Sequence, residues 1–200
     1  MSIILSLQGC MAVGKTTAVK YIQENAPYVN ISYELNQDVI EKVTEQKLDK
    51  NKFEDYLEIQ KLWIDKEIVR WEKAQQYPCS IMDFGAEEIE FYTLNYPATI
   101  GKDWEVEPFL HNELECLRKC SPKRILFLNA SEETLRKHKE NDGTRSRMFF
   151  EHHIQYLLPL KKEWLMNKDN VDVLYVDSLT GNQVGEKVKE WIDKWFEILR

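Results

Sequence analysis

The first seventeen residues contain glycines, a lysine and threonines at a spacing that could bind phosphate. Residues 9–17 read Gly-Cys-Met-Ala-Val-Gly-Lys-Thr-Thr directly after the apolar run 3–7, which matches the pattern GxxxxGK[ST] between a strand and a helix. Gly9 and Gly14 would let backbone N–H groups point at a phosphate near the N-terminus of that helix. Lys15 would reach the β- and γ-oxygens, and the Thr16 hydroxyl would bind Mg²⁺. The phosphate-binding residues that we expect here are Gly9, Ala12, Val13, Gly14, Lys15, Thr16 and Thr17.

A second basic segment could stabilise a phosphoryl group during transfer. Ser131 can cap a helix that leads to Gly143, and Arg136, Arg145 and Arg147 cluster around that glycine. Arginine meets phosphoryl oxygens with fixed paired donors, and a loop that closes can exclude water. We therefore predict an arginine-containing lid at about residues 137–148; the alternative is a solvated basic loop.

Two carboxylates could serve the group that accepts the phosphoryl. Glu34 follows the second predicted strand, and Asp83 ends the third. A kinase needs one group to orient or deprotonate the attacking hydroxyl and another to hold Mg²⁺ or its waters. We assign the first role to Glu34 and the second to Asp83, with the reverse assignment open. Glu34 alternatively is an exposed residue near a helix start.

The predicted helix 52–75 carries polar residues inside its apolar stripe. Gln60 and Glu67 lie among Phe53, Leu57, Ile64 and Trp71. Gln60 could read a planar heterocycle by paired amide hydrogen bonds, with Tyr56 and Trp63 beside it, or it could be satisfied by the protein itself. Arg70 is the only arginine before Arg118, so the region lacks the forked cations that grip a monophosphate. An unphosphorylated alcohol is therefore the expected acceptor.

Composition limits the classes of partner and compartment. The chain has 200 residues and a formal net charge of −7, which favours a single domain over residues 1–200 and disfavours a nucleic-acid polymer as partner. We expect no membrane association, because no stretch approaches the length of a membrane span. The four cysteines have no metal-ligand spacing, so we interpret them as reduced thiols in a cytoplasmic protein.

The elements that must position these residues alternate between strand and helix, which is typical of an α/β fold with a parallel sheet. Strands are expected at 3–7, 28–32, 79–83, 124–128 and 171–176, and helices at 15–25, 37–46 and 52–75. A final amphipathic helix, residues 184–199, is expected to cover the sheet with its tryptophans in the core. Because the carboxyl ends of parallel strands share one edge, Gly9, Glu34, Asp83, Asn129 and Asp177 are expected near one site.

With these residues in place, the chain resembles the P-loop nucleoside and nucleotide kinases, and most resembles their deoxynucleoside kinase branch. The matching pieces are the phosphate loop, Glu34, the aromatic-flanked Gln60, the pair Arg145 and Arg147, and a helix 156–165 that ends Glu-Trp-Leu. The resemblance implies a P-loop NTPase fold with a five-stranded parallel sheet, and ATP with Mg²⁺. It further implies Glu34 as general base, Gln60 paired with a nucleobase and lid arginines on the donor phosphates.

The sequence departs from this family at two places. Ala12 stands where the phosphate loop usually has glycine, and strand three ends Asp83-Phe84-Gly85 where an acid is usually followed by arginine and serine. The second departure bears on the substrate more than on the chemistry.

The leading hypothesis is an ATP-dependent kinase for a hydroxyl of a small molecule, most simply a nucleoside or deoxynucleoside. One alternative keeps the fold and changes the acceptor to an antibiotic, a sugar nucleotide or another metabolite. Another is a nucleotide-binding switch that acts on a partner protein, although the guanine-reading Asn-Lys-x-Asp segment is absent. The segment 96–107 is expected to be a loop that covers the acceptor or joins subunits, which leaves a homodimer open.

Overall fold

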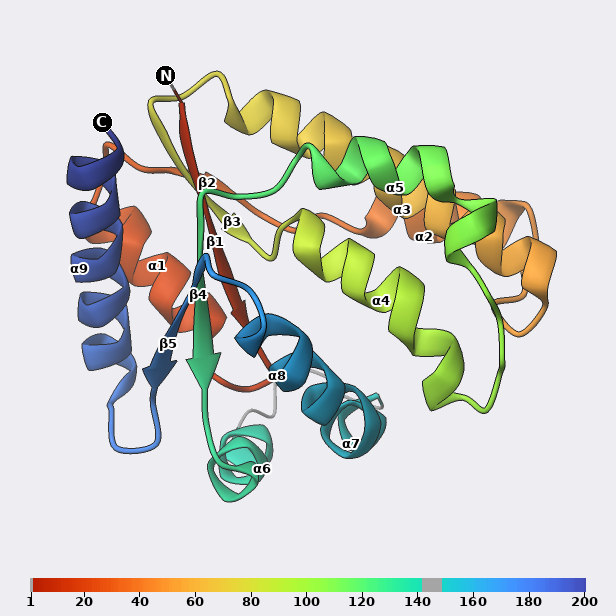
Figure 1. Ribbon diagram of the computed structural model, residues 1–200. Coiled ribbons are helices and arrows are strands. Elements are labelled where there is room, and N and C mark those ends of the chain that lie inside the picture. Colours follow the sequence, from red (N-terminus) through yellow and green to blue (C-terminus); the bar gives the residue numbers. More distant parts are fainter. Residues whose placement is uncertain (1, 142–148) are drawn as a thin grey trace.

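The computed structural model, which describes residues 2–141 and 149–200, is a three-layer α/β fold (Figure 1). Within the described residues, five parallel strands form one sheet in the order β2-β3-β1-β4-β5. The strands are β1 (Ile3–Gly9), β2 (Asn30–Ser32), β3 (Cys79–Asp83), β4 (Arg124–Asn129) and β5 (Val171–Tyr175). All seven residues of β1 are buried, as expected for a central strand that is covered on both faces.

Helices connect the strands and fill both outer layers. Their bounds are α1 (Lys15–Asn25), α2 (Gln37–Glu45), α3 (Phe53–Ala74), α4 (Ala86–Thr99), α5 (His111–Arg118), α6 (Glu132–Asn141), α7 (Phe150–His152), α8 (Leu158–Met166) and α9 (Gly181–Leu199). A 3₁₀ turn, η1 (Glu107–Phe109), precedes α5, and a π-helical turn, η2 (His153–Leu157), joins α7 to α8. None of the helices described is long and apolar enough to cross a membrane.

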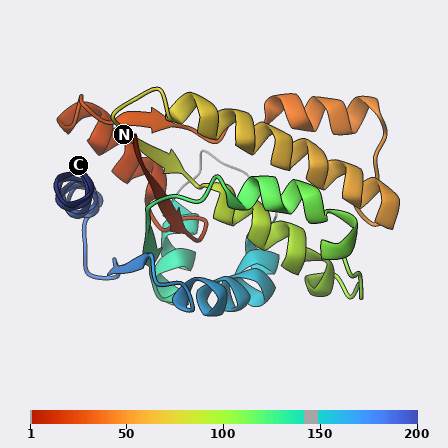
Figure 2. The same ribbon diagram turned by 45° about the horizontal axis from the view of Figure 1, so that its top comes forward.

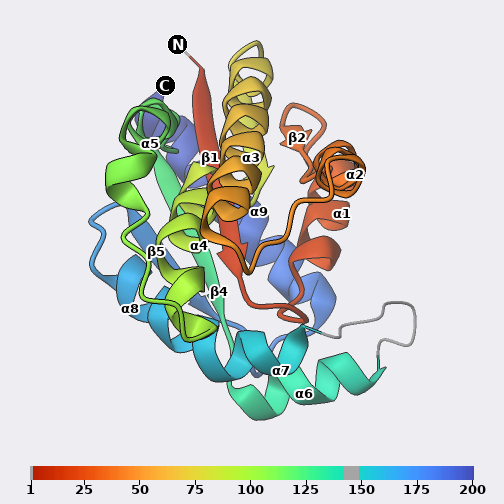
Figure 3. The ribbon, with the colours of Figure 1, turned by 90° about the vertical axis from the view of Figure 1, so that its right-hand side faces the viewer.

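The buried apolar side chains form two hydrophobic clusters, and the one that includes α1 and α9 also includes Leu158 and Leu165 of α8. Helices α1 and α9 pack together on one face, while α3, α4, α5 and α8 cover the other (Figures 1 and 2). Helices α6 and α7 lie beyond the carboxyl ends of the strands (Figure 3). This edge of the sheet therefore has helices above it as well as the loops that follow the strands.

Helix α9 is attached to the sheet through one carboxylate. Asp172 of β5 accepts hydrogen bonds from Trp191 Nε1 at 2.8 Å and Trp195 Nε1 at 2.9 Å, and Arg124 Nη2 donates to it at 2.7 Å. The Arg124 guanidinium also stacks on the Trp195 ring, 4.2 Å from its centroid. The two tryptophans therefore serve packing, as their helical spacing predicted.

Most expected elements are confirmed to within two residues, and three details are wrong. Strand β2 begins at Asn30 instead of Tyr28, because Tyr28 stacks on Phe196 and bonds to Asp193. The expected helix at 156–165 begins in the π turn. The expected loop at 96–107 is helical as far as Thr99.

Helix α4 continues past a proline because a neighbouring side chain takes over a lost hydrogen bond. Pro97 has no N–H to donate to the carbonyl of Thr93, four residues before it. The Tyr56 hydroxyl of α3 donates to that carbonyl instead, at 3.1 Å. A sequence pattern that treats proline as a helix end could not anticipate this contact between two helices.

Candidate active site

A cavity of about 1380 Å³ opens where the strands end, and the phosphate loop forms one wall. Its size exceeds the roughly 300–1,000 Å³ of a typical single-ligand pocket, so it has room for a donor and an acceptor. The wall residues from the loop and the first turn of α1 are Cys10, Met11, Ala12, Val13, Gly14, Lys15, Thr16 and Thr17. Gly9 lies beneath them, where an added Cβ would come 2.9 Å from the Leu128 carbonyl oxygen.

The loop has a positive φ angle at three positions. The angle is 150° at Gly9, 65° at Ala12 and 105° at Gly14, directly before α1. The value at Ala12 explains why glycine is usual there, because a Cβ disfavours this region by about 1–2 kcal/mol. The Ala12 carbonyl is 2.9 Å from His138 Nδ1 of α6, and this contact ties the strained position to a neighbouring helix.

The Lys15 side chain is held against its own loop. Its Nζ donates to the Gly9 carbonyl at 2.9 Å and to the Cys10 carbonyl at 3.1 Å, and it lies 4.1 Å from the centroid of the Phe84 ring. Burial lowers the pKa of Lys15, while the charge of Asp83 opposes that shift. A phosphate would replace the two carbonyls as a charged partner for the ammonium group.

The residues present fit a magnesium ion and a triphosphate. Asp83 Oδ1 is buried and has no hydrogen-bond partner, although it lines the cavity close to Lys15. Thr16 lines the same wall with its hydroxyl. Carboxylate and hydroxyl oxygens are ligands that Mg²⁺ prefers, so Thr16 and Asp83 would hold it as the sequence predicted.

Glu34 lies at the mouth of the cavity. Glu34 as a residue is exposed to solvent and lines the cavity. Neighbouring protein atoms still remove much of the water around its carboxyl group, and this desolvation raises the pKa of Glu34. The negative charge of Glu88 raises the pKa further, whereas a hydrogen bond with Asn36 lowers it. The carboxylate therefore has more affinity for a proton than an ordinary glutamate, which suits a general base.

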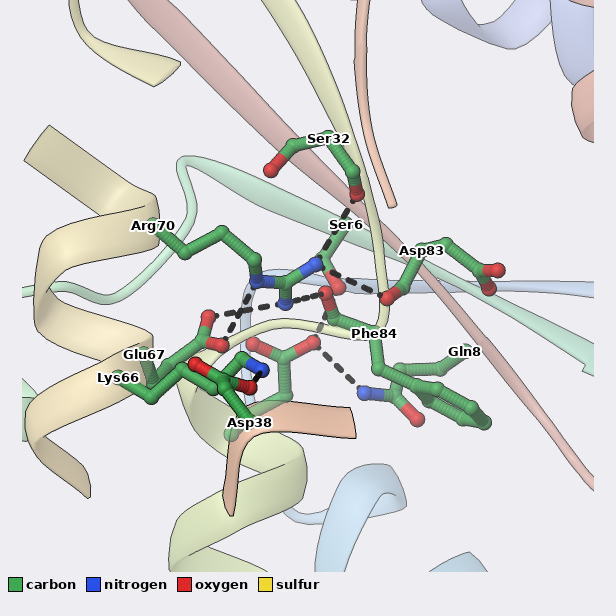
Figure 4. A network of polar contacts seen from close by, with 10 residues as sticks. Ser6, Gln8, Ser32, Asp38, Lys66, Glu67, Arg70, Asp83 and Phe84 are labelled. Atoms are coloured by element: carbon green, nitrogen blue, oxygen red, sulfur yellow. Dashed lines mark hydrogen bonds and ion pairs between the residues drawn. The ribbon is translucent and has the colours of Figure 1, made fainter. Parts of the chain in front are cut away.

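Arg70 joins the ends of two strands and is not available to a ligand. Its guanidinium donates to the carbonyls of Ser32 at 3.0 Å, Asp83 at 3.2 Å and Phe84 at 2.5 Å, and it pairs with the Glu67 carboxylate (Figure 4). Burial raises the pKa of Glu67 to about 7. Glu67 of the apolar stripe and Arg70 therefore form a structural ion pair on α3 that holds the ends of β2 and β3 next to Glu34 and Asp83.

The sequence Asp83-Phe84-Gly85 has a structural explanation. Phe84 has φ 57° and covers Lys15 with its ring. Gly85 makes room for Glu87, whose Oε2 would lie 2.5 Å from an added Cβ. Glu87 in turn accepts hydrogen bonds from Gln8, at 2.8 Å, and from Ser6 (Figure 4), and burial raises its pKa.

The three predicted acceptor residues lie together on α3. Tyr56, Gln60 and Trp63 all line the cavity. Gln60 Oε1 accepts a hydrogen bond from the Thr93 hydroxyl at 2.9 Å, so the protein orients this amide. Among the described residues its N–H groups have no hydrogen-bond acceptor. Tyr56 is 1% exposed and its hydroxyl is used by α4 carbonyls, which limits it to an apolar contact.

The lid prediction is described only in part. Arg145 and Arg147 lie outside the described residues. Arg136 does not line the cavity: its guanidinium pairs with Glu132, at 2.7 Å, and with Glu151, at 2.9 Å, on the surface of α6 and α7. Its role in phosphate binding stays a prediction that requires it to leave these carboxylates.

The sequence analysis did not predict the part of the cavity lining that comes from α4 and residues 149–153. The cavity residues that it missed on α4 and on the segment from 149 to 153 are Glu88, Ile89, Tyr92, Tyr96, Phe149 and His153. They escaped notice because α4 is buried on several sides and shows little amphipathic contrast. The adjacent acids Glu87 and Glu88 in the first turn of a buried helix were the available signal.

Comparisons with protein families and with curated proteins find no match to this chain. Solved structures do match. Deoxyadenosine kinase from M. mycoides with bound dATP is 14% identical with a TM-score of 0.72, over 96% of this chain and 100% of that one. The same kinase with dCMP and dCDP bound is 15% identical with a TM-score of 0.70, again over 96% and 100% of the two chains.

Thymidylate kinase from Candida albicans is 16% identical with a TM-score of 0.64, over 96% of this chain and 92% of that one. Likeness at such low identity shows a shared fold. The predicted five-stranded parallel sheet flanked by helices is thus confirmed, and it is shared with these solved kinases. The arginine-containing lid that belonged to the same prediction stays a prediction.

Proposed function

We propose that the protein is an ATP-dependent kinase that transfers the γ-phosphoryl group to a hydroxyl of a small molecule, a nucleoside or deoxynucleoside. One observation carries the proposal. The phosphate loop, two carboxylates and an amide flanked by aromatic rings line the same cavity. The shared fold supports the proposal, because the solved structures that match are nucleotide and deoxynucleoside kinases.

On the donor side, the loop N–H groups and Lys15 bind the β- and γ-phosphates and neutralise charge that develops during transfer. Thr16 and Asp83 would hold Mg²⁺, which when bound would supply charge neutralisation at the phosphate oxygens. Arg145 and Arg147 are proposed to complete the donor site.

On the acceptor side, Glu34 accepts the proton of the attacking hydroxyl. Gln60 donates hydrogen bonds to a planar ring that lies against Trp63 and Tyr56. The described residues that line the cavity include no arginine, so none of them offers the forked cation that grips a monophosphate on an acceptor. An unphosphorylated nucleoside therefore fits better than a nucleotide.

The test is ADP release from ATP and Mg²⁺, screened over deoxynucleosides, ribonucleosides and other small alcohols. We expect one nucleoside to stimulate release and to yield its monophosphate, and we expect Lys15→Ala to abolish transfer. ATP binding without stimulation by any member of the panel would contradict the proposal.

A second acceptor class, an alcohol that is not a nucleoside, is favoured by one observation. Phe84 directly follows Asp83, the acid that ends β3, and its ring packs on Lys15. In the family that the sequence resembles, an arginine usually stands at the position of Phe84. Unchanged acceptor preference in Gln60→Ala would favour this class, because a planar base would lose its hydrogen-bond partner in that variant.

A further inference from the structure

The phosphate loop of this chain contains one residue that does not suit its own backbone conformation. Ala12 has φ 65°, in the left-handed region, where a Cβ is disfavoured. Gly9 and Gly14 also have positive φ angles, but glycine adopts such angles without that cost. The loop alone would therefore favour another conformation at Ala12, so a contact from elsewhere in the protein has to hold it.

A side chain from outside the loop bonds to this position. His138 Nδ1 of α6 lies 2.9 Å from the Ala12 carbonyl oxygen, across 126 positions of the sequence. A carbonyl oxygen can only accept, so the proton lies on Nδ1 in the neutral as well as in the charged ring. His138 lines the cavity, and so does Asn141, one turn further along the same helix. The bond therefore lies where the phosphate loop faces the donor end of the cavity.

Helix α6 is anchored by contacts that do not involve the phosphate loop. Asp177, in the segment after β5, accepts hydrogen bonds from the Ser131 amide at 2.8 Å and from the Thr134 hydroxyl at 2.7 Å. Leu135, one turn before His138, is fully buried in the core. A side chain on such a fixed element can hold a loop in one conformation.

The bond from His138 differs from the bonds that Lys15 makes to the same loop. Lys15 Nζ donates to the carbonyls of Gly9 and Cys10, and a bound phosphate would draw the ammonium group away from them. A phosphate offers the Ala12 carbonyl no donor in exchange, so the bond from His138 can remain when the nucleotide binds. A conformation that is already held in the empty protein raises affinity, because binding does not have to order it.

We infer that His138 is a positioning residue for the donor: its hydrogen bond to the Ala12 carbonyl holds the phosphate loop in the left-handed conformation that receives the β-phosphate. The inference rests on the proposed function, in which this loop binds the phosphates of ATP. Ala12 and His138 then act as one unit, and Ala12→Gly makes the imidazole dispensable.

The test is a double-mutant cycle between Ala12→Gly and His138→Leu, measured as the Kd of ATP and of ADP with Mg²⁺ in a calorimetric titration without acceptor. With Ala12 in place, we expect His138→Leu to raise Kd about 3–10-fold, the range that one hydrogen bond of ordinary strength supplies. In the Ala12→Gly background, we expect the same change to raise Kd less than about 2-fold.

His138→Asn is the conservative variant, because the amide nitrogen lies as many bonds from Cα as Nδ1 does and keeps a donor there. We expect its Kd to stay within about 2-fold of the wild-type value. His111→Ala is the matched control, since it removes an exposed imidazole from α5 that does not line the cavity. Thermal melting checks folding, and if His138→Leu unfolds, His138→Ala supplies the same comparison.

Equal losses in the two backgrounds would mean that His138 touches the nucleotide directly, and no loss in either would mean that the loop does not need the bond. Both results, or a His138→Asn variant as weak as His138→Leu, would overturn the inference and leave nucleotide binding by the loop standing. Wild-type protein that binds neither ATP nor ADP would instead contradict the proposed function, and this inference with it.

Discussion

Several buried oxygen and nitrogen atoms around the cavity have no partner among the described residues. They include Asp83 Oδ1, Asn36 Oδ1 and His153 Nε2. A buried polar atom without a hydrogen bond costs about 1–3 kcal/mol, so these positions are costly for the empty protein. Ligand atoms that pair with them recover that cost, which is a physical reason to locate binding here.

The sequence predicted the residues that belong to a local pattern and missed those that do not. Lys15, Thr16 and Asp83 were found because a fixed spacing or a strand end marks them. His153 and Lys161 were missed because their role depends on burial against α4, which lies more than fifty residues away in the chain. Glu34 was identified from its place after a strand, and the cause of its raised pKa is visible only in three dimensions.

Glu34→Gln should lower kcat by about 10²–10⁴-fold and leave the KM for ATP nearly unchanged, because the amide cannot accept the proton. A base works when deprotonated, so wild-type kcat should fall as pH drops through the pKa of Glu34, which burial places above its ordinary value of 4.5. The variant should lack this acidic limb. A steady-state pH profile measures both effects, and undiminished turnover in the variant would remove the assignment.

At the scale of elements, charged side chains join segments that packing alone would leave free to shift. Arg70 connects α3 to the ends of β2 and β3, and Lys161 connects α8 to the first turn of α4. Both braces lie behind the cavity wall. Sequence periodicity places such helices but does not show which of them are tied together, because ion pairs between elements leave no local pattern.

Lys161→Met should destabilise the protein by about 3–5 kcal/mol, because Glu88 would remain buried without its partner. The double variant Lys161→Met with Glu88→Leu should regain most of that loss, since a buried ion pair contributes little net stability beyond apolar residues of similar size. Urea unfolding of the single and double variants measures this coupling. A loss below about 1 kcal/mol in the single variant would mean that water reaches Glu88.

Asp172→Asn should lower the free energy of unfolding at neutral pH by about 1–3 kcal/mol, because four hydrogen bonds to a charged acceptor are weakened. Although burial raises the pKa of Asp172, hydrogen bonds from Trp191 and Arg124 outweigh it and lower the pKa below 3.8. The wild-type advantage is therefore complete above the unfolded-state pKa and is lost as pH falls through the lower folded-state pKa. Unfolding curves from pH 2 to 7 test this; an advantage that is undiminished at the acid end would contradict it.

At the scale of the whole molecule, alternation of strands and helices was enough to predict a parallel sheet with its functional edge. The strand order was not predictable, because pairs such as β1 with β4 join residues more than one hundred positions apart. The bounds of α4 and α5 were not predicted either. In α4, Pro97 indicated a break, and the hydrogen bond from Tyr56 to the Thr93 carbonyl explains why this helix continues to Thr99.

ATP with Mg²⁺ should stabilise the entire domain, because its site lies between the sheet and the helices. Saturation at about 100 times Kd contributes roughly 2.7 kcal/mol, which raises Tm by about 5–10 °C in a protein of this size. Differential scanning fluorimetry of wild type and Lys15→Ala measures this. An equal shift in the two proteins would place the nucleotide elsewhere.

The absence of arginine from the described cavity lining has a consequence for turnover. The acceptor enters uncharged and, in the proposed reaction, leaves as a monophosphate with a charge of about −1.5 to −2. Glu34, Asp83 and Glu88 line the cavity together with Lys15, Lys20 and Lys50, and the described lining offers no guanidinium to hold the new phosphate. The product phosphate therefore lacks the paired, bidentate contact that arginine would give it, which favours release of the product.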